Sequence, residues 1–212
     1  MSLPTASRQL ILDCIRAVTQ NPSAYAKVLR TYIRRGGLGI QEKLKLMIER
    51  LREYDADVVE CAPKELPATI AGQLALSGRQ VFVAPAGLPA EWLAAGFDWK
   101  IDRGLENSEI ERAEGVVTAA FCGVADSGTI VLHHSSAEGR RILTLLPDWH
   151  LCILYASQVV ETLPEYFDRC PLPPVLATYI SGPSATADIE MTRIKGVHGP
   201  RFLNVILVRD ED

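Results

Sequence analysis

Residues able to bind or activate a small polar ligand surround a glycine in the run Ala125-Asp126-Ser127-Gly128-Thr129. Gly128 allows a ligand to approach the backbone closely. Ser127 and Thr129 offer hydroxyls that donate and accept hydrogen bonds, and Asp126 offers a carboxylate that can act as an acid or a base. The same residue types are what an ordinary hairpin turn demands, so a purely structural turn is the alternative.

A second segment of this kind runs from Ser181 to Asp188, after the apolar run 175–180 and at the start of an expected helix. Free N–H groups at a helix start, with hydroxyls beside them, form a natural site for a phosphate or carboxylate. Ligands of open α/β sheets lie at the carboxyl ends of strands, which favours binding over simple helix capping. Asp188 could orient a donor or act as a base. The expected ligand-binding residues here are Gly182, Ser184, Ala185 and Thr186.

A third segment places His198 and Gly199 on a loop just before the last expected strand. A titrating imidazole there can reach a ligand, although an isolated loop histidine is more often an ordinary surface residue. Arg141 begins a helix expected after the hairpin, where a guanidinium either clamps an anion or is simply solvated. We predict that the three segments line one cleft with Arg141 near its rim. If the chain catalyses a reaction, Asp126, Asp188 or His198 would be its acid or base.

The sequence indicates neither a metal site nor a cofactor bound by this chain. Its five cysteines are scattered, and no two have the spacing of a zinc knuckle or a redox motif. His133 and His134 are adjacent and cannot share a face of a strand, so they make a poor metal pair. Neither a dinucleotide fingerprint nor a Walker loop is present in the sequence. We therefore expect the purified chain to be colourless.

Charge and hydropathy exclude several classes of function. Lys and Arg number 22 against 26 Asp and Glu, and the resulting net charge of −4 makes nucleic acid a poor default partner. No apolar run reaches the roughly 18 residues of a membrane span. Residues 1–13 do not have the pattern of a signal peptide. The cytoplasm is the expected compartment.

Apolar periodicity predicts a helical extension over residues 1–55 and an α/β domain over residues 56–212. The extension has three apolar stripes at helical spacing: Ile11, Ile15 and Val18; Tyr25, Val28, Leu29 and Tyr32; and Leu44, Met47, Ile48 and Leu51.

From residue 57 on, short β-rich runs alternate with helical patterns, which favours βαβ units and a mixed, mostly parallel sheet flanked by helices. The β-rich runs 115–124 and 129–133 are four residues apart, so we predict an antiparallel hairpin between them. Strands are also expected at 151–155, 175–180 and 203–208, and helices at 64–76, 90–95, 140–146, 157–167 and 185–191.

Four strings of this sequence resemble the LUD-domain family, in particular its lactate-utilisation protein C (LutC) group. They are CGVADSGTIVL, GRRILTLLPDWHLCIL, YISGPSATADIE and GVHGPRFLNVILV. The resemblance runs from about Val116 to the C-terminus and more loosely back to about Asp57, whereas the N-terminal helices match only in length and character.

The resemblance implies a fold related to sugar-phosphate isomerases and coenzyme A transferases. It also implies two partners, LutA-like and LutB-like proteins that carry the iron–sulfur clusters, with which such a chain would oxidise L-lactate to pyruvate. An accessory or substrate-binding subunit that holds a small anion is therefore the leading hypothesis. The alternatives are a stand-alone enzyme acting on a phosphorylated or coenzyme A-linked molecule, and a non-catalytic scaffold for the iron–sulfur partners. Kinship of fold alone does not establish an activity.

Overall fold

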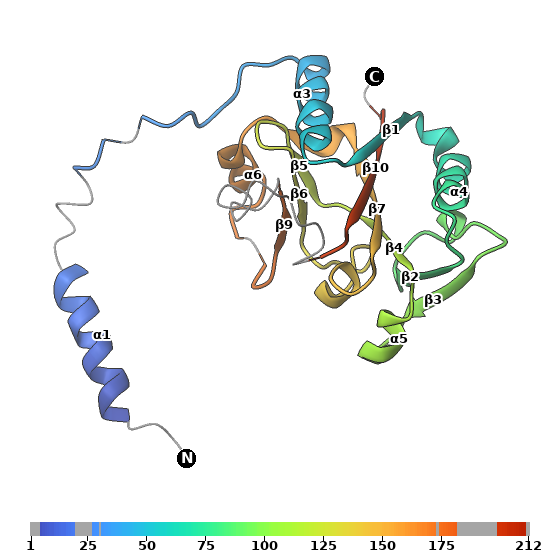
Figure 1. The fold of residues 1–212 in the computed structure, drawn as a ribbon. Coiled ribbons are helices and arrows are strands. Elements are labelled where there is room, and N and C mark those ends of the chain that lie inside the picture. The colour runs from blue at the N-terminus through green and yellow to red at the C-terminus, as the bar shows by residue number, and fades with distance from the viewer. Residues whose placement is uncertain (1–4, 20–26, 30, 173, 182–198, 211–212) are drawn as a thin grey trace, which may run out of the picture. The chain divides into compact units, whose positions relative to one another are not determined.

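Figure 1 shows the fold of the protein in a computed structural model. The structure describes residues 5–19, 27–29, 31–172, 174–181 and 199–210. By their contacts the residues divide into two units, Met1–Ile33 and Arg34–Asp212. Within the described part of the chain, no helix has both the length and the apolar character needed to cross a membrane.

The first unit contains α1 (Thr5–Thr19), the helix predicted from the first apolar stripe. The helix predicted around Val28 and Leu29 is wrong wherever the structure tests it, since residues 27–29 and 31–39 are turns, bends and irregular chain. Val28 and Leu29 are 58% and 84% exposed. Exposed side chains such as these contribute little of the tertiary packing on which most helices depend.

The boundary between the units falls between Ile33 and Arg34, earlier than the boundary that we predicted at residues 55–56. The difference lies in α3 (Ile40–Glu53), whose apolar stripe packs within the second unit rather than in an extension. The four side chains that the periodicity selected are all buried: Leu44, Met47, Ile48 and Leu51.

The second unit is built on a six-stranded sheet in which every pair of neighbouring strands is parallel, in the order β1-β10-β7-β4-β2-β3. The central strands read as nearly continuous apolar runs because both faces of the sheet are covered. The strands are β1 (Asp57–Cys61), β2 (Val81–Pro85), β3 (Asp98–Asp102), β4 (Gly115–Ala119), β7 (Trp149–Tyr155) and β10 (Phe202–Val208).

A smaller sheet has the order β8-β5-β6-β9 and carries the predicted hairpin. β5 (Cys122–Val124) and β6 (Thr129–Leu132) are antiparallel, which confirms the hairpin. The first predicted strand, however, is broken after Ala119. The N–H of Ala120 still bonds to a strand of the large sheet, whereas that of Phe121 bonds to Val131 of β6, so the chain changes sheets there. The edge strands are β8 (Val159–Val160) and β9 (Thr178–Ile180).

The small sheet and α3 cover one face of the large sheet, and α4 (Leu66–Leu76) covers the other (Figure 1). On the first face, Ile130 and Leu132 of β6 share a buried cluster with Val205 of β10. On the second face, Ile70 and Leu74 of α4 share a cluster that includes Ile206. The mostly parallel, helix-flanked α/β sheet predicted from the sequence is therefore confirmed.

Several predicted helices are shorter or of another type. Residues 140–146 contain a single 3₁₀ turn, η3 (Arg141–Thr144), and residues 90–95 contain another, η2 (Ala90–Trp92). Residues 157–167 are divided among η4 (Ala156–Gln158), β8 and α6 (Leu163–Arg169), because Val159 and Val160 pair with β5. The remaining short elements are η1 (Pro63–Glu65) and α5 (Asn107–Glu111). The helix predicted at 185–191 lies outside the described residues.

Candidate functional site

The turn between β5 and β6 is held against α3 by a close backbone approach. Gly128 adopts a left-handed φ of 64°, which glycine tolerates without strain. A Cβ at this position would lie 2.6 Å from Cβ of Arg50, so the turn touches the helix directly. The hydroxyl of Tyr54 then donates a 2.7 Å hydrogen bond to the carbonyl of Gly128. The sequence predicted a close approach at Gly128, but the group that comes close here is this protein's own helix.

Three hydroxyls converge beside this turn. The Oγ atom of Ser127 lies 2.7 Å from Oγ1 of Thr129, and Thr129 donates a 3.0 Å hydrogen bond to the Oγ atom of Ser181. Thr129 has one hydroxyl proton, so Ser127 must be the donor in the first of these bonds. The order Ser127 to Thr129 to Ser181 leaves the Ser181 proton to be donated onward. We call these three residues the hydroxyl cluster.

Strand pairing explains why Ser181 reaches Thr129. β9 runs antiparallel to β6, with Ile180 opposite Ile130, so the residues just beyond this pair, Ser181 and Thr129, also lie opposite each other. Thr129 is buried, whereas Ser127 and Asp126 are exposed. The structure therefore brings the first predicted segment to the beginning of the second. The carboxyl-end rule for parallel sheets does not account for this meeting, because β9 belongs to the antiparallel part of the small sheet.

Six of the predicted site residues lie outside the described residues: Gly182, Ser184, Ala185, Thr186, Asp188 and His198. The third segment is represented by Gly199, whose nearest contact for an added Cβ is the carbonyl of Thr144, at 3.7 Å. Arg141 belongs to the same 3₁₀ turn, η3, and is exposed. The structure thus joins the first two segments through side chains and places Gly199 beside η3. The prediction of one common cleft remains a prediction.

Arg50 supplies a cation next to the turn. Its guanidinium bonds to Glu53 at 2.8 Å, and its Nε atom is buried without a hydrogen-bond partner among the described residues. The pKa of Arg50 is raised above its ordinary value, first by the hydrogen bond to Glu53 and to a lesser degree by the charge of Asp126. Asp126 also anchors the turn, since its N–H donates to the carbonyl of Glu161 at 3.0 Å. These charged groups beside the turn are therefore one guanidinium, already paired with Glu53, and the carboxylates of Glu53 and Asp126.

Sequence reasoning missed Arg50, Tyr54 and Glu161. Their contacts with the turn join residues far apart along the chain, as in the 74-residue separation of Tyr54 and Gly128. Such contacts leave no local spacing to recognise. The signal for Ser181 was present, because it heads the hydroxyl-rich run Ser181–Thr186, but we had not selected it as a ligand-binding residue.

The described histidines are committed to local partners. Nε2 of His150 lies 2.8 Å from Oγ1 of Thr118 in the core, and burial lowers the pKa of His150 to about 4. Nδ1 of His134 must donate to the carbonyl of Gly139, because a carbonyl only accepts. His133 stacks on Phe121 and bonds to the hydroxyl of Tyr166, and burial lowers the pKa of this histidine.

The buried cysteines are poor nucleophiles. Burial raises the pKa of Cys122 to about 11 and that of Cys152 to about 12, so both thiols stay protonated at neutral pH. Across the part of the chain that the structure describes, no group of three or more His, Cys, Asp or Glu side chains could hold a metal ion.

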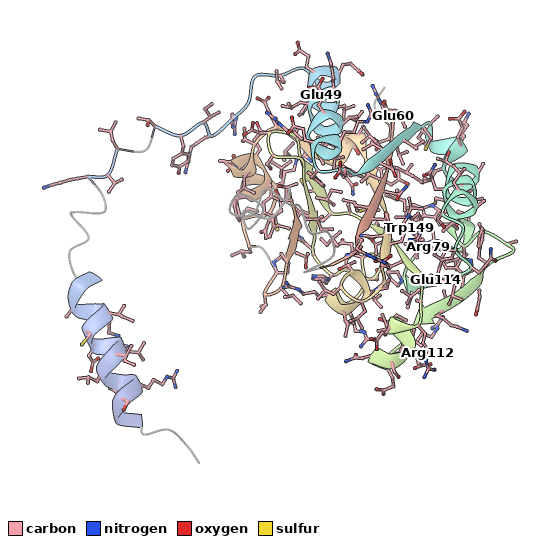
Figure 2. All side chains as sticks on the ribbon, in the orientation of Figure 1. Glu49, Glu60, Arg79, Arg112, Glu114 and Trp149 are labelled. Atoms are coloured by element: carbon pink, nitrogen blue, oxygen red, sulfur yellow. The ribbon has the colours of Figure 1, made fainter. Side chains whose placement is uncertain are left out.

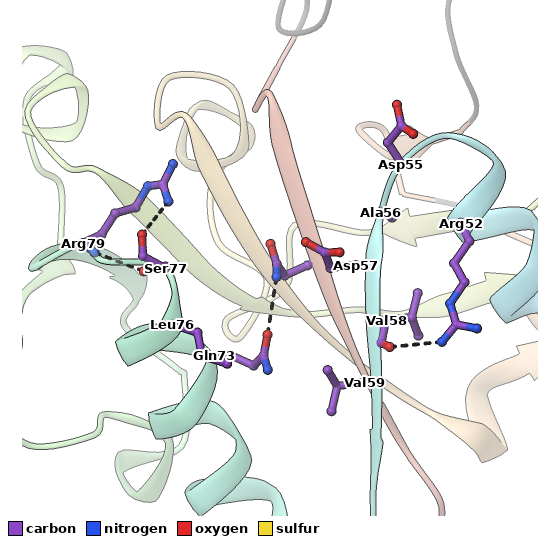
Figure 3. Close-up of a pocket in the computed structure, with 11 residues that line it drawn as sticks. Arg52, Asp55, Ala56, Asp57, Val58, Val59, Gln73, Leu76, Ser77 and Arg79 are labelled. Atoms are coloured by element: carbon purple, nitrogen blue, oxygen red, sulfur yellow. Dashed lines mark hydrogen bonds between the residues drawn. The ribbon is translucent and has the colours of Figure 1, made fainter.

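A separate cavity of about 760 Å³ lies at the amino ends of β1 and β10 (Figure 3). One of its cations, Arg79, is held by the protein: it donates to the Ser77 carbonyl, pairs with Asp148 at 3.6 Å and lies over the Trp149 ring (Figure 2). Helices α3 and α4 both end beside this cavity, and the partial negative charge of helix C-termini opposes an anion. The described residues that we predicted for the site do not line it, so we place the candidate site at the hydroxyl cluster.

Comparison with known proteins gives a consistent set of relatives. The family model described as the LUD domain matches residues 44–208. A protein named lactate utilization protein C from Deinococcus radiodurans is 40% identical over 169 residues, which cover 76% of each chain. A Bacillus subtilis protein of the same name is 35% identical over 134 residues, covering 58% of this chain and 55% of that one.

A solved structure resembles the fold. The crystal structure of a DUF162 family protein from Deinococcus radiodurans superposes with a TM-score of 0.70 at 34% sequence identity. The match covers 81% of this chain and 99% of that chain.

Proposed function

This chain belongs to the LUD-domain family, and from that premise we propose that it takes part in lactate utilisation as an accessory or substrate-binding subunit. In this role it holds a small anionic ligand at the hydroxyl cluster. Relatives of this chain carry the name lactate utilization protein C, which supports the biological process. The site itself is supported by the chain's own geometry.

The observation that carries the proposal is the convergence of Ser127, Thr129 and Ser181. Lactate has a carboxylate and a hydroxyl, so it can accept and donate hydrogen bonds at once. The Ser181 proton, directed onward by the chain of hydroxyls, suits a carboxylate oxygen. The exposed Ser127 can accept from the ligand's hydroxyl.

The remaining parts of the proposed site stay as we predicted them from the sequence. Gly182, Ser184, Ala185 and Thr186 would supply further donors after Ser181. Asp126, Asp188 and His198 would orient the ligand or exchange a proton with it. Gly199 would line the cleft with them, and Arg141 would lie near its rim.

Oxidation of lactate to pyruvate removes two electrons, and an acceptor must receive them. The cysteines of this chain are scattered, and Cys122 and Cys152 are buried and protonated. The family resemblance implies iron–sulfur LutA-like and LutB-like partners, and we propose that these partners accept the electrons while this chain holds the substrate.

A growth experiment tests the function. A strain lacking the gene for this chain is expected to grow on pyruvate but not on L-lactate. Wild-type protein and the Gly37→Ala variant should restore growth on L-lactate, since Gly37 has no neighbouring atom within 4 Å of an added Cβ. Thr129→Val should restore it poorly, because valine keeps the shape and removes the central hydroxyl. Unimpaired growth of the deletion strain on L-lactate would contradict the proposal.

A further inference from the structure

Residues 34–39, which we call the strap, lie against residues 161–165, which join β8 to α6 and include the start of α6. The N–H of Gly36 donates to Oε1 of Glu165 at 2.8 Å, and the N–H of Leu38 donates to Oε2 of Glu161 at 2.7 Å. The hydroxyl of Thr162 donates to the carbonyl of Arg34 at 3.2 Å. These three bonds join residues more than 120 positions apart, so they are tertiary contacts.

The fit of the strap depends on one glycine. A Cβ at Gly36 would lie 1.7 Å from Cδ of Glu161 and about as close to both carboxylate oxygens, so any side chain there displaces Glu161 or the strap. An added Cβ at the adjacent Gly37 meets nothing within 4 Å. Gly36→Ala and Gly37→Ala are therefore a matched pair of variants. Only at Gly36 does the added Cβ overlap another residue.

Glu161 links the strap to the turn of the candidate site. Its side chain accepts the N–H of Leu38, while its backbone carbonyl accepts the N–H of Asp126. The N–H of Glu161 itself donates to Glu165, the other carboxylate that holds the strap. Glu161 thus binds the strap through its carboxylate and the turn through its backbone carbonyl. The turn residue that it binds, Asp126, immediately precedes Ser127 of the hydroxyl cluster.

We propose that the strap is a releasable latch that controls the order of the 125–129 turn. With the strap docked, Glu161 is fixed by its side chain and its N–H, and its carbonyl holds the turn in place. When the strap leaves, the Glu161 carboxylate loses the N–H of Leu38 and turns to solvent, whereas Glu165 loses the N–H of Gly36 but keeps those of Glu161 and Thr162. The anchor of the turn is then less rigid. The strap directly follows residues 1–33 in sequence. We therefore expect an interaction that displaces residues 1–33 to displace the strap from Glu161 as well. The consequence for ligand affinity rests on the function proposed above.

Hydrogen–deuterium exchange of the full chain without any ligand tests the latch. In Gly36→Ala, amide exchange in peptides covering both 34–39 and 125–129 should rise at least about tenfold, the factor that corresponds to roughly 1.4 kcal/mol of local opening. Peptides from β7 and β10 should keep the exchange rates of the wild type. Gly37→Ala should match the wild type throughout.

Faster amide exchange in 34–39 with unchanged exchange in 125–129 would overturn the proposal, because release of the strap would then have no effect on the turn. Equal effects of Gly36→Ala and Gly37→Ala would also overturn it. If Gly36→Ala does not fold, Leu38→Pro removes the N–H that Glu161 accepts, and the same pair of results is expected. The measurement contains no ligand, so failure of the latch and failure of lactate binding are separate outcomes.

Discussion

The hydroxyl of Thr129 donates a hydrogen bond to the hydroxyl of Ser181, 3.0 Å away and 52 residues later in the chain. This bond joins the turn 125–129 to the first residue of the segment 181–188, two segments that are far apart in sequence. It also directs a serine proton away from the buried Thr129. The candidate site therefore depends on the pairing of β9 with β6 as much as on its own residue types.

Replacement of Gly128 by alanine should destabilise the fold and move the turn off α3. A left-handed φ costs a non-glycine residue about 1–2 kcal/mol, and the added Cβ would also lie 2.6 Å from Arg50. Gly78→Ala is the matched control, because Gly78 has a φ of 69° but open space around its added Cβ. Urea unfolding should show a larger loss for Gly128→Ala, by roughly 1–3 kcal/mol of overpacking. Equal losses would show that the close approach to α3 is unimportant.

Tyr54→Phe should loosen the turn without creating a clash. The variant removes the hydroxyl that donates to the carbonyl of Gly128 and keeps the ring that packs beside α3. The free energy of unfolding should fall by about 1 kcal/mol, the usual contribution of such a bond. Amide exchange in residues 125–129 should increase in the same variant. A Tyr54→Phe protein with wild-type stability and exchange would remove this contact from the account of the site.

Much of the fold follows from local patterns in the sequence. The apolar runs in β7 and β10 and the short connection between β5 and β6 predict a parallel core with a hairpin. The break after Ala119 could not be predicted, because Ala120 and Phe121 are as apolar as their neighbours and differ only in which distant strand they pair with.

Only part of the candidate site could be predicted from its residue types. Ser127 and Thr129 were selected because glycine and hydroxyls meet at a turn. Tyr54 and Glu161 were not, because each looks like an ordinary surface residue until the fold brings it to the turn.

Stability should fall with acid through His150. Burial lowers the pKa of this histidine from 6.5 to about 4, so the unfolded chain takes up a proton at a higher pH than the folded chain does. The free energy of unfolding should therefore decrease as the pH falls from about 6.5 to about 4, by roughly 3 kcal/mol from this group. Urea unfolding across that range, for the wild type and for His150→Asn, measures the difference. An equal pH slope in the two proteins would show that His150 does not contribute.

The isolated chain should not oxidise lactate. Dye reduction with L-lactate is expected at the background rate when the chain is purified alone, and above background once iron–sulfur partners are added. The purified chain should also be colourless and free of stoichiometric iron. Lactate-dependent dye reduction by the chain alone would contradict the division of labour proposed here.

The most direct test of the central claim is a calorimetric titration of L-lactate into the wild type, Thr129→Val and Thr69→Val. Thr69 lies on α4 and bonds to the carbonyl of Glu65, so its valine variant makes the same chemical change away from the turn. Thr129 orients the hydroxyls of Ser127 and Ser181 rather than touching the ligand itself. Loss of these two ordinary hydrogen bonds, at about 1 kcal/mol each, should weaken binding by Thr129→Val roughly tenfold. Thr69→Val should bind as the wild type does. Equal affinity of Thr129→Val and the wild type, or the absence of binding by the wild type, would contradict the assignment of the hydroxyl cluster as the ligand site.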